Sequence, residues 1–331
     1  MHAIDTDSPE RAVALDPSGR VDAVGPDGYA PFPVVADPDR WRLTRTVVPT
    51  ADGPVVVHHR AGRDPLLLLH GVAGSWTTWT PLLRAAEGAA DRADHAVADR
   101  LDDRGLVLVD LPGWGSSPAP AEPLDVDGSA RALTAVLDAL GVGSVDVVGH
   151  SMGAFVAMHL ALTEPARVRS VALVSGTTVA TADAARHPLR GLRTLPAFTL
   201  LRAGLAITGE TARPVLRGIA RVGLLPLVAS PVFTHVRRLD PSVLDAFVEE
   251  LRPTGFTAAA RSAAGYDLDR WRSVTCPVTA IAGRDDVFAR VSDLDALADL
   301  LPQVRTVLLD DCGHFAHVEH PGAVARVLDL A

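Results

Sequence analysis

The feature that most constrains this fold is an alternation of short apolar runs with amphipathic stretches along most of the chain. The apolar runs are rich in valine and leucine and are bounded by glycine, proline or charged residues, which is typical of buried strands. They occupy residues 55–57, 66–69, 106–109, 145–148, 171–174, 278–282 and 304–309. Because each run is short and nearly continuous in its apolar character, we expect strands that are buried on both faces.

Stretches with helical spacing lie between these runs. In residues 130–140, the side chains Leu133, Val136, Leu137 and Leu140 fall on one face of a helix. Similar patterns occupy 152–162, 294–301 and 323–330. Strands that alternate with helices predict an α/β fold, in which a mainly parallel sheet is covered by helices on both faces.

The first 40 residues do not share this pattern. Residues 1–40 contain eight acidic side chains, three arginines and recurrent prolines. This composition is typical of a poorly ordered tail, although Phe32 and Trp41 are large apolar groups that could pack against the body.

A second interruption occupies residues 178–265. It contains no convincing strand, several amphipathic stretches, and eleven arginines against six acidic residues. We interpret it as a helical cap inserted into a core formed by residues 41–177 and 266–331. Arg213, Arg217 and Arg221 share one face of a predicted helix in this segment, which is typical of a solvated surface but could also receive an anionic substrate or an acidic carrier protein.

Composition excludes several kinds of chemistry. All 31 basic residues of this 331-residue chain are arginine, and asparagine is absent as well. The chain therefore has no lysine for a Schiff base or a phosphate loop, and no asparagine side chain to bind an oxyanion. A net charge of −9 argues against nucleic acid as the main partner.

Two further properties bear on the compartment. Cys276 and Cys312 do not make a disulfide framework, and the acidic start lacks the pattern of a signal peptide. No apolar run reaches the ~18 residues of a membrane span. We therefore expect a cytoplasmic protein without a membrane span.

The segment Gly149-His150-Ser151-Met152-Gly153 carries the strongest chemical signal. It fits the pattern G-x-S-x-G, follows the predicted strand at 145–148 and opens the helical stretch that starts at Met152. In this context the glycines permit a sharp strand-to-helix turn that exposes the serine oxygen above the sheet. The positive end of the helix also favours a negative charge that develops nearby.

With this motif the chain resembles the α/β-hydrolase superfamily over residues 43–330. The resemblance implies a second oxyanion loop, matched by the segment 70–74 (His-Gly-Val-Ala-Gly), so that the backbone N–H groups of Val72 and Met152 would bind the oxyanion. A further family loop is matched by 110–117 (Asp-Leu-Pro-Gly-Trp-Gly-Ser-Ser). His70 and His150 occupy positions that are usually structural in this family.

The resemblance also implies the two partners of the serine. The acid follows a late strand and is matched by Asp286, with the adjacent Asp285 as an alternative. The base follows the last strand and is matched by His314. The order of serine, acid and histidine is that of this superfamily. The surrounding loop and helix account for His317 and His320 without a metal, so we expect neither a metal nor a cofactor.

These motifs imply a serine hydrolase that cleaves an ester or related acyl bond of a fairly apolar small molecule through an acyl-enzyme on Ser151. The same triad serves thioesterases, acyltransferases, lactonases, carbon–carbon bond hydrolases and cofactor-free haloperoxidases, and the basic cap keeps an anionic or carrier-linked substrate open. A non-catalytic ligand receptor is the alternative from another class. We expect the substrate pocket to include the aromatic residues Trp76, Trp114, Phe198, Phe233 and Phe315, and Trp79 to lie in the core.

Overall fold

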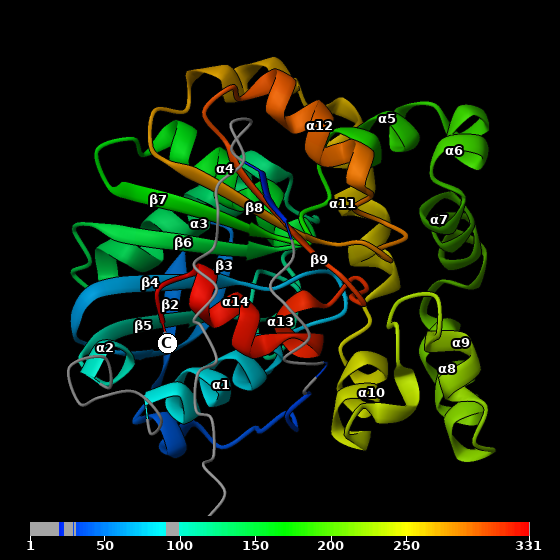
Figure 1. The fold of residues 1–331 in the computed structure, drawn as a ribbon, viewed down its shortest axis with the longest axis horizontal. Helices are drawn as coiled ribbons and strands as arrows, with labels where there is room; N and C mark the ends of the chain where they lie inside the picture. The colour runs from blue at the N-terminus through cyan, green and yellow to red at the C-terminus, as the bar shows by residue number, and fades with distance from the viewer. Residues whose placement is uncertain (1–19, 23–28, 30, 91–98, 331) are drawn as a thin grey trace, which may run out of the picture.

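The computed structural model describes residues 20–22, 29, 31–90 and 99–330, and within them a single sheet of nine strands forms the centre of the molecule (Figure 1). The strand order is β1-β9-β8-β7-β6-β4-β5-β3-β2. The strands are β1 (Arg20–Asp22), β2 (Thr44–Thr50), β3 (Gly53–Arg60), β4 (Arg63–Leu69), β5 (Arg104–Val109), β6 (Val145–His150), β7 (Val168–Val174), β8 (Val278–Gly283) and β9 (Arg305–Leu309).

Most of the strand pairs are parallel, which confirms the predicted α/β fold. The exceptions are β3, which is antiparallel to both β2 and β5. Every apolar run of the sequence lies in one of the strands. β2 was not predicted because it is an edge strand whose side chains are mostly exposed, so it shows no apolar run. Its Pro49 is also tolerated at an edge, where a donor is not required on both sides.

Helices cover both faces of the sheet. On one face, α3, α4 and α12 pack against the strands, and on the other face α1 and α14 do so. The helices of the described residues outside the inserted segment are α1 (Thr80–Ala90), α2 (Asp99–Asp102), α3 (Val126–Ala139), α4 (Met152–Thr163), α12 (Val291–Leu300), α13 (Ala316–Glu319) and α14 (Pro321–Val327).

The alternation of side chains along each strand divides the core into two layers. In β4, Leu67 and Leu69 belong to the cluster with α3 and α4, whereas Leu66 and Leu68 belong to the cluster with α1 and α14. All four are almost completely buried. A strand whose two faces are both apolar has to lie between two layers of helices, so β4 is held in the middle of the sheet.

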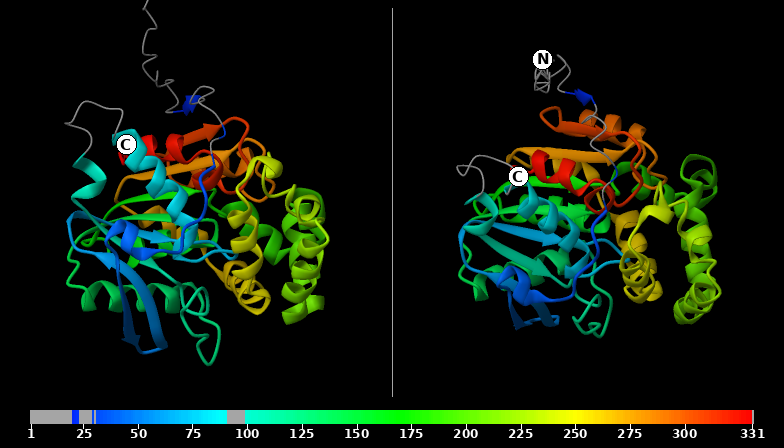
Figure 2. Two further views of the ribbon diagram at one scale, coloured as in Figure 1. Left: turned by 90° about the horizontal axis from the view of Figure 1, so that it is seen from below. Right: turned by 60° about the horizontal axis from the view of Figure 1, so that its bottom comes forward.

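The segment between β7 and β8 is helical throughout its regular structure. It comprises α5 (Val179–Arg186), α6 (Pro188–Thr194), α7 (Pro196–Thr208), α8 (Ala212–Arg221), α9 (Leu225–Ala229), α10 (Pro241–Glu249) and α11 (Pro253–Gly265). These helices lie at one side of the sheet, with α7 and α8 outermost (Figures 1 and 2). A third cluster of buried residues joins them to the body through Phe288, Phe315 and Val318.

The predicted tail, 1–40, falls largely outside the described residues. Its described part contacts the body at several points. The N–H of Val34 donates to Ser242 Oγ at 2.9 Å, and the N–H of Val35 donates to Thr80 Oγ1 at 3.0 Å. The Tyr29 carbonyl accepts a hydrogen bond of 2.8 Å from Arg238. No helix within the described ranges has the length and apolar character needed to cross a membrane.

Candidate functional site

Three loops at the carboxyl ends of parallel strands bring Ser151, Asp286 and His314 together. Ser151 follows β6, Asp286 follows β8 and His314 follows β9. Ser151 Oγ lies 2.9 Å from His314 Nε2, and His314 Nδ1 lies 2.9 and 3.0 Å from the two carboxylate oxygens of Asp286. All three residues are at least nine-tenths buried. The carboxyl edge of a parallel sheet is where such residues from different strands can converge.

The backbone at Ser151 is strained. Its φ of 52° and ψ of −118° place this non-glycine residue in a sparsely populated region. The turn can be this sharp because α4 lies directly against the strands. A Cβ on Gly149 would collide with the backbone of Gly153, and a Cβ on Gly153 would collide with the carbonyl of Leu69. The two glycines therefore allow the approach that exposes the serine side chain.

The hydrogen bonds assign the proton positions of the triad. The Asp286 carboxylate can only accept, so His314 carries a proton on Nδ1, and its Nε2 accepts the hydroxyl proton of Ser151. Asp286 Oδ1 also accepts from the N–H groups of Phe288 at 2.7 Å and Ala289 at 2.9 Å, which hold the carboxylate in place. Asp285 is exposed, and its N–H donates to the carbonyl of Cys312. The carboxylate beside His314 is thus that of Asp286.

A buried carboxylate outside the triad holds the His314 loop. Glu319 accepts from the N–H groups of Gly313 and Phe315, on either side of the histidine, at 3.1 and 3.4 Å. It also accepts from the N–H of Thr234 at 2.9 Å, in the inserted segment. Burial raises the pKa of Glu319 to about 7, although these three donors act in the opposite direction. Sequence reasoning missed this residue; its signal was an acid placed among apolar residues on the helix after the histidine.

The other predicted histidines have structural contacts. His150 Nε2 donates to the carbonyl of His314 at 3.0 Å, and burial holds the pKa of His150 well below its usual value. His70 Nε2 accepts from the N–H of Leu111 at 3.0 Å. Burial likewise lowers the pKa of His317 to about 3. Among the described residues, no group of three His, Cys, Asp or Glu side chains is arranged to hold a metal ion.

The two predicted oxyanion residues flank the serine. Val72 and Met152 both line the same cavity as Ser151. Within the described part of the chain, no hydrogen bond uses the N–H of Val72 or of Met152. An N–H at the first turn of a helix, as at Met152, has no partner within that helix. Both groups are therefore available as donors to a ligand.

The loop 110–117 fixes the position of the segment 70–74, the predicted oxyanion loop that contains Val72. The buried carboxylate of Asp110 accepts from the N–H groups of Trp76 and Ser116, each at 2.8 Å. In the same loop, Trp114 Nε1 donates to the Val72 carbonyl at 3.1 Å. These bonds connect the segment after β4 to the segment after β5.

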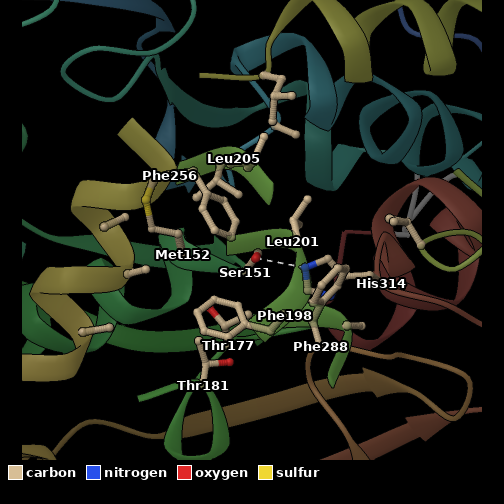
Figure 3. A pocket seen from close by; sticks show the side chains of 18 of the residues that line it. Ser151, Met152, Thr177, Thr181, Phe198, Leu201, Leu205, Phe256, Phe288 and His314 are labelled. Carbon is tan, nitrogen blue, oxygen red and sulfur yellow. Dashed lines mark hydrogen bonds between the residues drawn. The ribbon is translucent and has the colours of Figure 1, made fainter. Parts of the chain in front are cut away.

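Above the triad lies a cavity of about 540 Å³ between the body and the inserted helices. Its lining is almost entirely apolar and includes Phe198, Leu201, Leu205, Phe256 and Phe288, which surround the Ser151–His314 hydrogen bond (Figure 3). Such a concave apolar site with a few polar groups is typical of a pocket for a small molecule.

Of the predicted pocket residues, Trp114, Phe198 and Phe315 line the cavity. The predictions for Trp76 and Phe233 are wrong. Trp76 packs on the opposite face of the sheet, stacked on His58 with 4.2 Å between ring centroids. Phe233 is not among the residues that line the cavity; its ring stacks on that of Phe315, with 4.8 Å between the centroids.

Other lining residues had no sequence signal. Phe256 and Phe288 come from α11 and from the loop after β8, and only the packing of the inserted segment on the body makes them neighbours. Thr181 also lines the cavity, and its buried hydroxyl has no hydrogen-bond partner among the described residues. Trp79 lies in the core, as predicted.

Charge is nearly absent from the cavity. Among the described residues that line it, Asp125 is the only ionisable one apart from the two histidines, and none is an arginine. The predicted face of three arginines on α8 lies outside. Its Arg217 forms an ion pair with Glu249 of α10, whose Oε1 lies 2.6 Å from Arg217 Nε. Arg213 and Arg221 make no such pair with any described residue.

Known proteins resemble the chain in sequence and in fold. A family model described as alpha/beta hydrolase fold matches residues 64–321. A 2-hydroxy-6-oxononadienedioate/2-hydroxy-6-oxononatrienedioate hydrolase from Burkholderia vietnamiensis is 29% identical, over 81% of this chain and 86% of its own. A provisionally named carbamate hydrolase from Variovorax paradoxus is 30% identical, over 82% and 92%. An esterase structure from Exiguobacterium antarcticum superposes with a TM-score of 0.64 at 16% identity, covering 86% and 98%.

The raised pKa of Glu319 predicts a dependence of stability on pH. An acid with an ordinary pKa of 4.5 in the unfolded chain and about 7 in the folded chain keeps its proton longer when folded. The free energy of unfolding should therefore fall as the pH rises through this window. Since Glu319→Gln cannot ionise, its stability relative to the wild type should improve between about pH 5 and about pH 7.5. Urea unfolding at both values measures this.

Glu122→Gln, at an exposed position, is the matched control, and its difference from the wild type should stay constant with pH. A constant difference for Glu319→Gln as well would contradict the raised pKa of Glu319.

The partnerless hydroxyl of Thr181 predicts a stabilising substitution. Burying a hydroxyl without a partner costs about 1–3 kcal/mol, so Thr181→Val should raise the free energy of unfolding by about 1 kcal/mol. Thr199→Val is the matched control, because this buried hydroxyl, also on a helix of the inserted segment, donates to the Leu195 carbonyl at 3.0 Å. Thr199→Val should lower the free energy of unfolding. Urea unfolding measures both variants, and a change of the same sign in both would contradict the prediction for Thr181.

Proposed function

The chain belongs to the α/β-hydrolase fold family, and from this premise we propose that it is a serine hydrolase that cleaves an ester or related acyl bond of a neutral, apolar small molecule. The observation that carries the proposal is the hydrogen-bonded series from Ser151 through His314 to Asp286. Many hydrolases of this family share such a series, and its order along the chain is the one that the fold requires.

In the first step, Ser151 Oγ attacks the carbonyl carbon of the substrate while His314 Nε2 takes the hydroxyl proton. A serine hydroxyl needs this base, because it is a weak nucleophile as long as it keeps its proton. The carboxylate of Asp286, 2.9 Å from Nδ1, stabilises the imidazolium and keeps Nε2 directed at the serine.

The negative charge then develops on the former carbonyl oxygen. We propose that the N–H groups of Val72 and Met152 bind it, a contribution worth about 10²–10³ in rate for one such donor. His314 returns its proton to the leaving group as the carbon–oxygen bond breaks, which leaves the acyl group on Ser151. Water, deprotonated by the same histidine, releases the acid and restores the serine.

The cavity supports a neutral substrate. The lining residues that the structure describes include no cation, and the chain has no lysine. A substrate carboxylate buried here would meet apolar side chains and the carboxylate of Asp125, and an unpaired buried charge is costly. We propose that the inserted segment 178–265 acts as the cap that supplies most of this apolar lining.

The absence of a cation from the described cavity lining separates the proposal from its alternatives. The relative from Burkholderia vietnamiensis is named for a dioate, a substrate with two carboxylates. The present cavity offers no basic partner for either of them, so carbon–carbon bond hydrolysis of a dianion is disfavoured. A thioesterase or acyltransferase acting on a carrier-linked acyl group uses the same triad; only the acyl group would enter the cavity, and the arginines of α8 lie outside it.

The triad geometry predicts a graded loss of activity. Ser151→Ala should abolish hydrolysis of p-nitrophenyl esters and labelling by a fluorophosphonate probe, because the attacking oxygen is removed. Asp286→Asn should lower kcat by about 10⁴-fold, since the amide favours the wrong tautomer of His314. Steady-state kinetics and thermal unfolding of each variant measure activity and fold separately.

Asp285→Asn is the matched control for the acid, because Asp285 is exposed and adjacent but does not contact His314. Its kcat should stay near that of the wild type. Retained turnover in a folded Ser151→Ala variant would refute the proposed function, and a wild-type chain that does not react with the probe would favour a ligand receptor.

The absence of a cation from the described lining of the cavity predicts discrimination against anions. The p-nitrophenyl ester of octanoic acid should be hydrolysed with a kcat/KM at least about a hundredfold above that of the mono-p-nitrophenyl ester of octanedioic acid, which has the same chain length and one terminal carboxylate. The methyl ester of the second compound is the control, and its kcat/KM should approach that of the octanoate. Equal rates for the anion and its methyl ester would show that the cavity tolerates the charge.

A further inference from the structure

The exposed apolar side chains of this molecule are concentrated on one surface. Apart from Val47 on β2, every large apolar side chain that is exposed in the described part of the chain lies within residues 188–229, on α6–α9 or the turns between them. The most exposed are Leu189 (84%), Ile207 (85%) and Val222 (68%). We call residues 188–229 the α6–α9 surface. An apolar surface of this kind usually has a partner.

The same surface is strongly basic. It carries six arginines and one acidic residue, Glu210, within a chain whose net charge is −9, which leaves −14 for the remaining residues. Two of the arginines are engaged with acids, Arg190 with Asp183 and Arg217 with Glu249. Arg193 and Arg221 are exposed and have no acidic partner among the described residues.

The helix α8 shows how the two properties combine. Its arginines, at positions 213, 217 and 221, follow one face, whereas Val215, Ile219 and Val222 follow the opposite face. In a helix packed on a protein core the apolar face would be covered, yet Val222 is 68% exposed, and Val215, which also lines the cavity, is 54% exposed. A basic amphipathic helix with an uncovered apolar face is typical of peripheral membrane proteins.

Part of the α6–α9 surface also lines the cavity. Leu200, Leu201, Val215 and Val228 line the cavity and are exposed at the same time. The helices that carry them form the outer layer of the molecule, on the side away from the sheet, in each view of Figures 1 and 2. The α6–α9 surface is therefore continuous with the lining of the cavity that contains Ser151.

We propose that the α6–α9 surface docks on the surface of an anionic lipid bilayer. The leucine, isoleucine and valine side chains would enter the boundary between headgroups and acyl chains, and the arginines would pair with lipid phosphates. The bilayer is favoured over a protein partner because the apolar residues and the cations are interleaved along the same helices and open onto an apolar cavity. The docking itself does not depend on the proposed hydrolysis; only the delivery of a substrate from the bilayer to Ser151 rests on it.

Flotation of the full chain with lipid vesicles tests the proposal. The wild type should float with vesicles made of equal parts phosphatidylcholine and phosphatidylglycerol, and much less with pure phosphatidylcholine. Because a cation near an anionic surface contributes about fivefold to binding, Arg193→Glu combined with Arg221→Glu should weaken binding by at least about 25-fold. Ile207→Ser combined with Leu227→Ser should also release the protein, and added salt should weaken the wild-type interaction.

Two control variants match these changes outside the surface. Arg305→Glu combined with Arg326→Glu alters the net charge equally on exposed residues of the body, and Val47→Ser removes the one exposed large apolar side chain elsewhere in the described residues. Both should bind as the wild type does. Thermal unfolding confirms that each variant is folded.

Several results would overturn the proposal. Failure of the wild type to float, equal binding to both kinds of vesicle, or an equal loss in the control variants would each do so. A wild-type dimer in size-exclusion chromatography that Ile207→Ser and Leu227→Ser convert to monomer, without vesicle binding, would instead identify the surface as a contact between two copies. Ester hydrolysis in solution is measured on the same samples, so the failure of docking and the failure of the proposed function are distinguished.

Discussion

The close packing of α4 on the central strands is the constraint on which the rest of the site depends. The absence of side chains at Gly149 and Gly153 brings the helix backbone against β4 and β6, and this forces Ser151 into a conformation with φ of 52°. A strained turn of this kind persists only where its surroundings over-determine it. Here the surroundings are the nearly fully buried side chains of residues 66–69 in β4 and of most of β6, whose packing holds the strained turn that presents the serine hydroxyl.

Once the serine is fixed, the other groups of the site have to keep their positions relative to it with a precision of a fraction of an ångström. Three buried carboxylates outside the triad do this by accepting backbone N–H groups. Asp110 joins the loops after β4 and β5, and Glu319 brackets His314 and reaches the inserted segment. Asp293 of α12 accepts from the hydroxyl of Thr178 at 2.8 Å and the N–H of Ala180 at 2.7 Å, where that segment begins. Burial of a carboxylate without partners would cost free energy. Here each buried carboxylate accepts hydrogen bonds from separate segments and so fixes those segments relative to one another.

Much of the fold could be predicted from the sequence, since its signals are local. A parallel strand buried on both faces appears as an apolar run, and the turn at Ser151 requires its glycines two residues to either side. The pairing of Asp286 rather than Asp285 with His314 was open, because adjacent residues differ only in the direction that the loop gives them. The cavity lining could not be predicted, because it depends on how the helices pack. Phe233 and Phe315 are equally apolar in sequence, yet only Phe315 lines the cavity, and Trp76 faces the other side of the sheet.

The charge distribution follows from the same separation of body and inserted helices. A cavity without cations keeps the local dielectric low around Ser151, His314 and Asp286, and this strengthens each of their hydrogen bonds. Arginines placed inside would weaken that effect and would attract water and anions. Six of the 31 arginines lie instead on α6–α9, outside the described lining of the cavity. Selection of a neutral substrate would then rest on apolar complementarity within the cavity, whereas the arginines outside would serve the proposed docking on an anionic bilayer. Neither role requires the lysine or asparagine that the sequence lacks.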